Sequence, residues 1–393
     1  MITEKLFHLM AEKRASDIFI TIGMPIQIKI QGACMPVNNQ IVKPDVMQKI
    51  IGELLTKEQE ETFNRERELN ISRGMRGLGN FRINLFRQRS STAIVVRYVQ
   101  GDIPELESLG LPSVLKEMVL EKRGLILMVG STGSGKSTTI ASMLNYRNAR
   151  MPGHILTVED PIEFLFKHNK SMVNQREVGI DTDGWLSALK NAMRQAPDCI
   201  MIGEIRDRET MRAAISYAQT GHLCISTLHA NNAYFALNRI VNFFPQDARD
   251  GLLMDLAVTL IVIISQRLVR RPDGRRLAAC EIMLNNTHIS ELILRGEIAS
   301  IKEQLDKKQV SGSQTFEQDL LRLYRNNEIT LDEALVNSDS PTNLTWLIDN
   351  TEAIEAGDAT QINNSLGNLS DQNSGGPSFQ EFKLDVEDHA EEK

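Results

Sequence analysis

The stretch that decides the fold of the central part of this chain is Gly130-Ser131-Thr132-Gly133-Ser134-Gly135-Lys136-Ser137. It follows the apolar run 125–129, which is typical of a buried parallel strand, and it precedes the helix-compatible run 138–144 that begins with Thr138. Glycines let such a loop wrap a polyphosphate with its N–H groups pointing inward, and the following helix N-terminus adds partial positive charge. The pattern G-x-x-x-x-G-K-S therefore predicts a nucleotide-binding loop made of these eight residues and Thr138. In it, Lys136 is expected to contact the β- and γ-phosphates, and Ser137 to ligate Mg²⁺.

Around this loop, short apolar strands alternate with helical stretches, which is the pattern of a parallel sheet with helices on both faces. The predicted strands are 125–129, 155–158, 199–202, 223–227, 261–269 and 278–283. The predicted helices include Trp185–Gln195, which ends before Pro197, and the core-facing segments 211–217 and 252–260. We expect an α/β ATPase domain over 113–288, followed by a helical C-terminal region over 289–350.

The first hundred residues predict a smaller α/β domain with an antiparallel sheet. A helix is expected over Ile2–Arg14, and a helical pair or one broken helix over Pro44–Glu68. The expected strands are 17–22 and 26–30, followed by a hairpin over 79–87 and 93–98. A proline-marked linker over 101–112 joins this domain to the next one.

Composition and charge exclude several classes of protein. The four cysteines among 393 residues form no C-x-x-C pair, which argues against a disulfide framework or a zinc knuckle and is typical of a reducing cytosol. The segment 351–393 holds ten acidic residues and two lysines, so it is predicted to be a disordered acidic tail. The remainder is close to neutral, which disfavours nucleic acid as a partner. The longest apolar run, Leu256–Ile264, is too short to span a bilayer, so we expect membrane association only through partners.

Two strands end in carboxylates, at the sheet edge where parallel α/β folds bind ligands. The run from Ile155 leads to Glu159 and Glu163, and the apolar run 199–202 leads to Glu204 in a Walker B pattern. A nucleotide hydrolase needs one carboxylate to activate water and others to hold Mg²⁺ through water, for which Glu159 and Glu204 are the candidates. Whether Glu163 or Glu204 is the general base stays open at this stage.

Two histidines and four arginines complete the candidate set. His222 and His229 flank one predicted strand, about 20 Å apart, so they cannot share a metal ion, and a role for one of them in sensing the γ-phosphate is the hypothesis. The hairpin at 79–98 carries Arg82, Arg87, Arg89 and Arg97. Any single one of these arginines is expected to lie on a solvated face, while one or two of the group are candidates to reach phosphates of a neighbouring subunit.

Taken together, four segments resemble those of the PilT-type secretion ATPases, which retract type IV pili. They are Gly130–Ser137, the acidic box Thr157–Glu163, the Walker B stretch through Glu204 and the histidine box Thr220–Asn231. Four further stretches look most like the PilU branch of this family, namely Gln175–Asp183, Leu189–Asp198, Gly221–Ala233 and Gln314–Leu321. The resemblance covers about residues 1–350.

The resemblance implies a PAS-like N-terminal domain, a RecA-like ATPase domain and a ring of six subunits. It places ATP and Mg²⁺ in a cleft between the two domains, with N-terminal arginines, here Arg82 and Arg97, reaching the phosphates. It places Glu163 near the attacking water, makes Glu204 the Walker B acid and puts His222 in the histidine box as a catalytic candidate. The family's C-terminal retraction motif is matched only loosely, by Ile289–Gly296.

The predicted function is a hexameric, ATP-hydrolysing motor that supports pilus retraction and twitching motility. Its expected partners are a PilT-like paralogue and an inner-membrane pilus platform protein, and its expected place is the cytoplasmic side of the inner membrane at the pilus base. One alternative is an accessory subunit that binds a PilT-like motor and modulates its force. A second alternative, a type II secretion or pilus-extension ATPase, is disfavoured because no four-cysteine zinc module is present.

Overall fold

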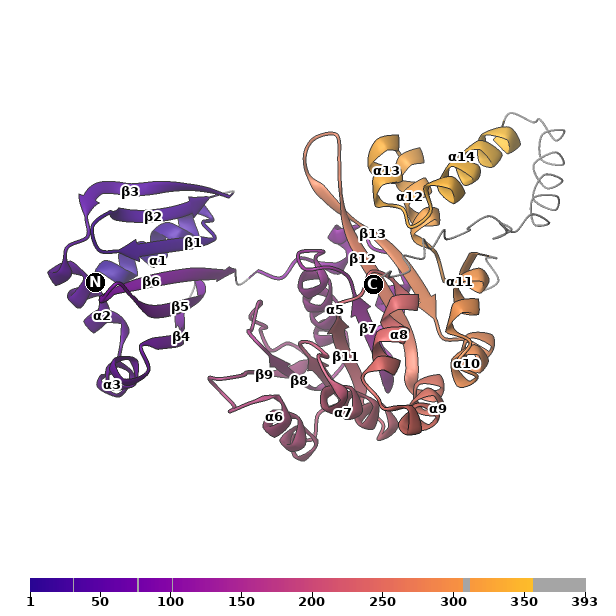
Figure 1. Cartoon of the computed structure of the whole chain (residues 1–393), viewed down its shortest axis with the longest axis horizontal. Coiled ribbons are helices and arrows are strands. Elements are labelled where there is room, and N and C mark those ends of the chain that lie inside the picture. The colour runs from indigo at the N-terminus through magenta and orange to yellow at the C-terminus, as the bar shows by residue number, and fades with distance from the viewer. Residues whose placement is uncertain (31, 76–77, 101, 307–311, 356–393) are drawn as a thin grey trace, which may run out of the picture.

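The computed structural model describes residues 1–355 apart from 31, 76–77, 101 and 307–311, and it holds two separate β-sheets joined by a short linker (Figure 1). Most of the predicted tail, from residue 356 onward, lies outside the described residues. Within the described part, no helix has the length and apolar character needed to cross a membrane.

The N-terminal unit is a six-stranded antiparallel sheet with the strand order β3-β2-β1-β6-β5-β4. Its strands are β1 (Asp17–Thr21), β2 (Pro25–Ile30), β3 (Ala33–Ile41), β4 (Glu68–Met75), β5 (Gly79–Gln88) and β6 (Ser91–Gln100), and its helices are α1 (Ile2–Lys13), α2 (Pro44–Leu54) and α3 (Lys57–Glu66). The core lies between the sheet and the helices, where Phe7 of α1 stacks on Phe81 of β5 at 4.3 Å between ring centroids. The antiparallel sheet and the hairpin are confirmed, and Pro44–Glu68 is resolved as two helices.

The second unit is a seven-stranded sheet with the order β13-β12-β7-β11-β10-β8-β9. All neighbouring strands are parallel except β12 and β13. Its strands are β7 (Gly124–Val129), β8 (Gly153–Glu159), β9 (Ser171–Glu177), β10 (Cys199–Ile202), β11 (Leu223–Leu228), β12 (Leu260–Arg270) and β13 (Arg276–Leu284). The six strands predicted here are confirmed, and β9 was missed.

Helices cover both faces of this sheet and form two separate apolar layers. One layer includes α4 (Val114–Met118), the 3₁₀ turn Leu106–Leu109 and α5 (Lys136–Arg150). The other includes α6 (Trp185–Ala192), α7 (Arg208–Gln219), α8 (Ala233–Asn242), α9 (Arg249–Thr259), α10 (Thr287–Leu294) and α11 (Ile298–Asp306). Strand β7 is buried over its whole length between these layers, so the loop that follows it starts from a rigid point.

The last three helices, α12 (Phe316–Arg325), α13 (Leu331–Asn337) and α14 (Pro341–Glu355), pack around a small core of their own. That core meets the sheet at Val269 of β12 and Ala279 of β13, and Figure 1 shows the three helices gathered beside these two strands. Helix α14 runs to Glu355, so the prediction that the disordered tail begins at residue 351 is wrong for 351–355.

Glu281 on β13 is a buried carboxylate at the junction between α8 and the C-terminal helices. It accepts hydrogen bonds from the Ala233 amide at 2.7 Å and the Ser265 hydroxyl at 2.9 Å. Burial raises the pKa of Glu281 from 4.5 to about 7, and the nearby charges of Asp339 and Glu317 act in the same direction. The protonated form of Glu281 therefore persists to a higher pH in the folded protein than in the unfolded chain.

We expect this group to make stability depend on pH. A raised folded-state pKa contributes stability that is present below about pH 4.5 and is lost as the pH rises through about 7. The Glu281→Gln variant removes this loss, which amounts to at most about 3 kcal/mol. In urea unfolding, the variant should gain stability over the parent at about pH 7.5 relative to about pH 5. The exposed Glu209→Gln serves as control, and an equal difference at both pH values for Glu281→Gln would contradict the assignment.

Candidate active site

The Gly130–Ser137 loop leaves β7 and enters α5, and two of its glycines are required by close packing. Gly130 has a φ of +153°, and a Cβ there would lie 2.5 Å from the Ser134 hydroxyl. Gly135 has a φ of +87°, and a Cβ there would lie 2.7 Å from the Gln266 amide nitrogen. Residues with a Cβ rarely adopt these φ values, and a Cβ would have no space here. The loop therefore packs tightly against Gln266 of β12 and against its own Ser134 side chain.

Lys136 and Ser134 supply the chemistry that a phosphate ligand requires. The Lys136 ammonium donates to the Gly130 and Ser131 carbonyls, both at 2.8 Å, and its side chain is buried. Burial lowers the pKa of this ammonium, and the charges of Glu204 and Glu163 oppose the change. The buried Ser134 hydroxyl has no hydrogen-bond partner among the residues that the structure describes. A cation and a spare donor in a glycine cradle fit a nucleotide polyphosphate.

Gln266 of β12 supports the loop from behind, and the sequence analysis did not identify it. Its amide nitrogen donates to the Ser134 carbonyl at 2.8 Å, and its amide oxygen accepts from the Thr139 hydroxyl of α5 at 2.8 Å. Both interactions join segments more than 120 residues apart in the sequence. A glutamine inside a strand gives no sequence signal of such a role.

A cavity of about 210 Å³ beside the loop brings most of the predicted residues together. Its walls come from the loop and from the ends of β8, β10 and β11, which are the carboxyl ends of neighbouring parallel strands. The chemically relevant residues that line it are Lys136, Ser137, Glu159, Glu163, Glu204 and His229. We call this cavity the phosphate cleft.

Glu204 follows β10 and is held by contacts to both of its oxygens. Oε2 accepts from Arg206 Nε at 2.8 Å, and Oε1 lies 3.3 Å from His229 Nε2. Arg206 also lies 3.7 Å from Asp160 of the acidic box. The neighbouring Asp207 carboxylate caps α7 by accepting from the Thr210 amide at 2.8 Å.

The two carboxylates of the acidic box have different surroundings. Glu159 is buried and accepts from the Thr157 hydroxyl at 2.6 Å and the Gln175 amide at 3.2 Å, and burial raises its pKa. Glu163 is exposed on the loop after β8, and its carboxylate makes none of the hydrogen bonds or ion pairs found among the described residues. Its charge acts on Lys136 and Arg82. Glu163 is thus the carboxylate left available to water in the cleft.

The two histidines lie at opposite ends of β11, and the structure places only His229 in the cleft. His222 precedes the strand and lies 3.1 Å from the Thr220 hydroxyl and 3.3 Å from the Tyr217 carbonyl oxygen. Within one chain it is about 20 Å from the phosphate loop end of the sheet. The structure thus places His222, the predicted catalytic histidine, outside the phosphate cleft of its own chain. The rule that ligands bind at the carboxyl ends of parallel strands points to His229 instead.

Burial is the main reason why the pKa of His229 is lowered, and the positive charge of Lys136 adds to it. The Glu204 carboxylate acts in the opposite direction. Because the ordinary value is already 6.5, His229 is mainly neutral at physiological pH. A neutral imidazole does not repel the Lys136 ammonium. It can therefore lie beside the cleft and respond when a charged group enters.

Among the hairpin arginines, Arg82 contacts the acidic box. Its guanidinium donates to the Ile162 carbonyl and lies 3.7 Å from Glu177, while its buried Nε has no partner among the described residues. Arg97, its cross-strand neighbour, is 65% exposed and pairs with Asp17 at 2.9 Å, outside the phosphate cleft of the same chain. Arg87 is engaged within its own domain by Thr92 and Asn64.

Comparisons with known proteins show the family of this chain. The model of the family described as "Type II/IV secretion system protein" matches residues 1–310. The chain is 46% identical over 346 residues to the type IV pilus ATPase PilU of Pseudomonas aeruginosa, which covers 88% of this chain and 91% of that protein. It is 36% identical over 342 residues to the pilus retraction ATPase PilT of the same organism, covering 87% of this chain and 99% of PilT.

A solved structure gives the same result for the fold. The crystal structure of the pilus retraction motor PilT with bound ADP matches with a TM-score of 0.81 at 40% identity. The match covers 87% of this chain and 98% of that chain. Sequence, fold and the glycine cradle with its lysine thus agree, and the chain belongs to the type II/IV secretion system protein family, within its PilT/PilU group of pilus ATPases.

Proposed function

We propose that this chain is an ATP-hydrolysing motor subunit that supports type IV pilus retraction and twitching motility. The observation that carries the proposal is the phosphate cleft, where Lys136, Glu163, Glu204 and His229 line one cavity beside the glycine loop. The likeness to PilU and PilT over nearly the whole described chain supports the assignment to pili. ADP in the matching PilT structure supports an adenine nucleotide as the ligand.

The architecture supports a finer description of the two units. A phosphate loop after a central parallel strand, with helices on both faces, supports a RecA-like ATPase domain over 113–288. An antiparallel sheet with helices on one face supports a PAS-like N-terminal domain. We propose that six chains assemble into a ring, as implied by the family.

Each cleft residue then has a distinct role. Lys136 neutralises the β- and γ-phosphate charge, and Ser137 holds Mg²⁺ with help from Glu204 and Glu159 through water. Bound Mg²⁺ would neutralise charge on the phosphates and hold the phosphate groups of the nucleotide in position. Glu163 is the general base, because its carboxylate is exposed to the cleft while both Glu204 oxygens are engaged. His229, in place of His222, senses the γ-phosphate through Glu204.

Arg82 gives the N-terminal domain a way to respond to the nucleotide. Its contacts to Ile162 and Glu177 already join the two domains. Its buried Nε has no partner among the described residues, and we propose that it donates to a phosphate when the domains close. We propose that nucleotide binding closes the domains and that loss of the γ-phosphate reopens them. The ring then passes the motion to an inner-membrane pilus platform protein, on the cytoplasmic side of the membrane at the pilus base.

One observation favours a second candidate, an accessory subunit of a PilT-like motor. Of the two Pseudomonas relatives, PilU is more similar to this chain, and its name gives a pilus ATPase without mention of retraction. The name of PilT, which is less similar, does include retraction. An accessory subunit with an intact phosphate cleft would still hydrolyse ATP. The two candidates therefore differ in what the subunit achieves without a paralogue.

Cells that carry this ATPase and lack its PilT-like paralogue provide the test. If the chain is a self-sufficient motor, labelled pili should retract and the cells should spread by twitching. If it is an accessory subunit, retraction should require the paralogue, and the Lys136→Ala variant should lower the retraction force when the paralogue is present. Normal retraction force in the absence of this chain, with or without the paralogue, would contradict both candidates.

A further inference from the structure

The loop between β11 and α8 connects the phosphate cleft to the C-terminal helices within four residues. His229 lies 3.3 Å from Glu204 in the cleft, and Asn232 caps the N-terminus of α8 by accepting from the Phe235 amide at 3.0 Å. Three residues of extended backbone span at most about 10 Å. A displacement of His229 is therefore transmitted through this short segment to Asn232. We call residues 229–232 the sensor loop.

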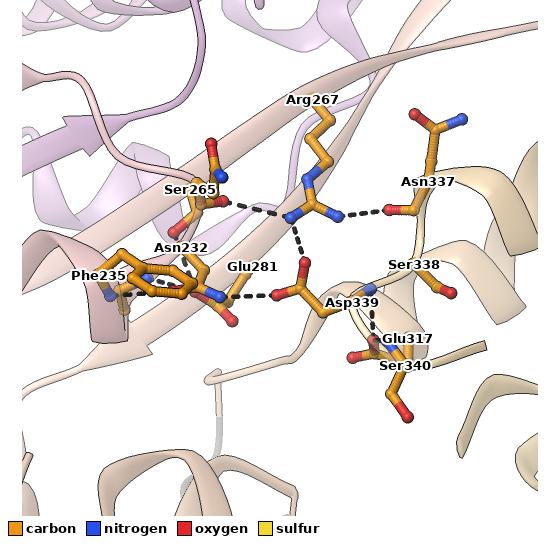
Figure 2. Close-up of polar contacts among 12 residues, drawn as sticks. Asn232, Phe235, Ser265, Arg267, Glu281, Glu317, Asn337, Ser338, Asp339 and Ser340 are labelled. Carbon is orange, nitrogen blue, oxygen red and sulfur yellow. Dashed lines mark hydrogen bonds and ion pairs between the residues drawn. The ribbon is translucent and has the colours of Figure 1, made fainter. Parts of the chain in front are cut away.

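Two side chains from outside the sensor loop hold its far end (Figure 2). The Asn232 amide donates to Asp339 Oδ2 at 2.7 Å, and Arg267 Nη2 donates to the Asn231 carbonyl at 3.4 Å. Arg267 and Asp339 also form an ion pair with each other. The two loop asparagines are thereby fixed by one strand residue and one residue from the turn between α13 and α14.

The same contacts seat the C-terminal helices. Arg267 donates to the Asn337 carbonyl and lies over the Phe316 ring at 3.9 Å. The buried Glu317 accepts from the Asp339 and Ser340 amides at 2.9 and 2.8 Å, which fixes the turn that carries Asp339 (Figure 2). These polar contacts fix where Asp339 lies relative to the sensor loop.

We propose that Asp339 and Arg267 are positioning residues for ATP hydrolysis, which hold the sensor loop so that His229 meets Glu204. This inference rests on the proposed function of the phosphate cleft. It follows that the contacts of the turn between α13 and α14 set the turnover of a cleft that α12–α14 do not line. By linkage, nucleotide-dependent movement of His229 in turn shifts the seating of those helices.

The test compares the steady-state ATP hydrolysis of the full-length parent and three variants. Asp339→Asn keeps the shape of the side chain but removes its charge, and it should lower kcat about tenfold with KM changed less than about twofold. The exchange variant Asn232→Asp/Asp339→Asn restores a donor–acceptor pair and a good helix cap, and it should recover kcat to within about twofold of the parent. Arg267→Lys keeps the positive charge but loses the planar guanidinium that contacts several acceptors at once. Its kcat should fall as in Asp339→Asn.

Glu333→Ala is the matched control. Glu333 also joins the C-terminal helices to β12, by accepting from the Arg270 amide at 2.8 Å, but it does not contact the sensor loop. Its kcat should stay within about twofold of the parent. An equal loss in Glu333→Ala and Asp339→Asn, parental kcat in Asp339→Asn and Arg267→Lys, or failure of the exchange variant to recover would each overturn the proposal.

Amide hydrogen exchange gives a readout that does not depend on hydrolysis. The amides of residues 229–233 should exchange faster in Asp339→Asn than in the parent or in Glu333→Ala, because the loop is no longer held. Unchanged exchange there would overturn the proposal even if hydrolysis were affected. A parent without measurable hydrolysis would contradict the proposed function instead, and the exchange result would still decide whether Asp339 holds the loop.

Discussion

Replacing Lys136 by alanine is expected to reduce ATP turnover by at least about 100-fold, the largest single effect in this protein. The ammonium lies buried in the glycine loop, 2.8 Å from two backbone carbonyls, and the charges of Glu204 and Glu163 both act on it. Removing this cation leaves those two carboxylates facing a polyanion without compensation. Nucleotide binding should weaken together with turnover, because Lys136 contacts phosphates in the ground state and in the transition state.

Titration with a fluorescent ATP analogue and a phosphate-release assay measure the two effects. The exposed Lys302→Ala on α11 is the control for loss of a lysine, and it should behave like the parent. Thermal unfolding shows whether the loop variant is folded. Equal turnover in folded Lys136→Ala and parent would contradict the assignment of the phosphate cleft.

The second large effect is expected for Glu163→Gln, with a fall in kcat of about 100-fold or more. Glutamine has nearly the same shape but cannot take a proton from water. Because Glu163 is exposed and does not hold other side chains, nucleotide affinity should change less than about twofold. The variant should therefore bind ATP and keep it, which a filter-binding assay can measure directly.

Glu204→Gln separates the role of the base from that of the metal-holding group. Glu204 contacts Arg206 and His229, and we propose that it holds Mg²⁺ through water. The difference in kcat between Glu204→Gln and the parent should become smaller as the concentration of free Mg²⁺ is raised. The difference between Glu163→Gln and the parent should not change. If Mg²⁺ rescues Glu163→Gln and leaves Glu204→Gln unchanged, the two roles must be exchanged. The exposed Glu209→Gln controls for the substitution itself.

Much of the fold follows from local patterns in the sequence. The phosphate loop is a short segment whose glycines, lysine and flanking strand and helix all indicate one structure, so its position and role could be predicted. The buried parallel strands are continuous apolar runs and were predicted for the same reason. The carboxylates after β8 and β10 followed from the rule for the carboxyl ends of parallel strands.

Three strands were missed, β3, β4 and β9, and two of them show how weak the local pattern can be. Strand β3 is exposed over almost all of its length and contains Pro36, so it has no apolar alternation. Strand β9 lies at the sheet edge, where polar residues such as Asn174 and Gln175 are tolerated. In both cases pairing with a neighbouring strand, which no local window contains, decides the structure.

The residues that position the site were the least accessible to sequence analysis. Gln266 supports the loop, and Asp339 holds the sensor loop, yet both act across more than 100 residues of sequence. Long-range partners of this kind become visible only when the strand order is known.

Strand β12 places Gln266 and Arg267 next to each other, and successive side chains of a strand point to opposite faces. One face of this strand therefore supports the phosphate loop while the other holds the C-terminal helices. A single inserted residue before Gln266 would exchange the two faces and disconnect both partners at once. The turn after Arg270 carries no such constraint, because the pairing with β13 ends there. In relatives of this chain, length variation should thus be excluded from the first part of β12 and concentrated in the β12–β13 turn.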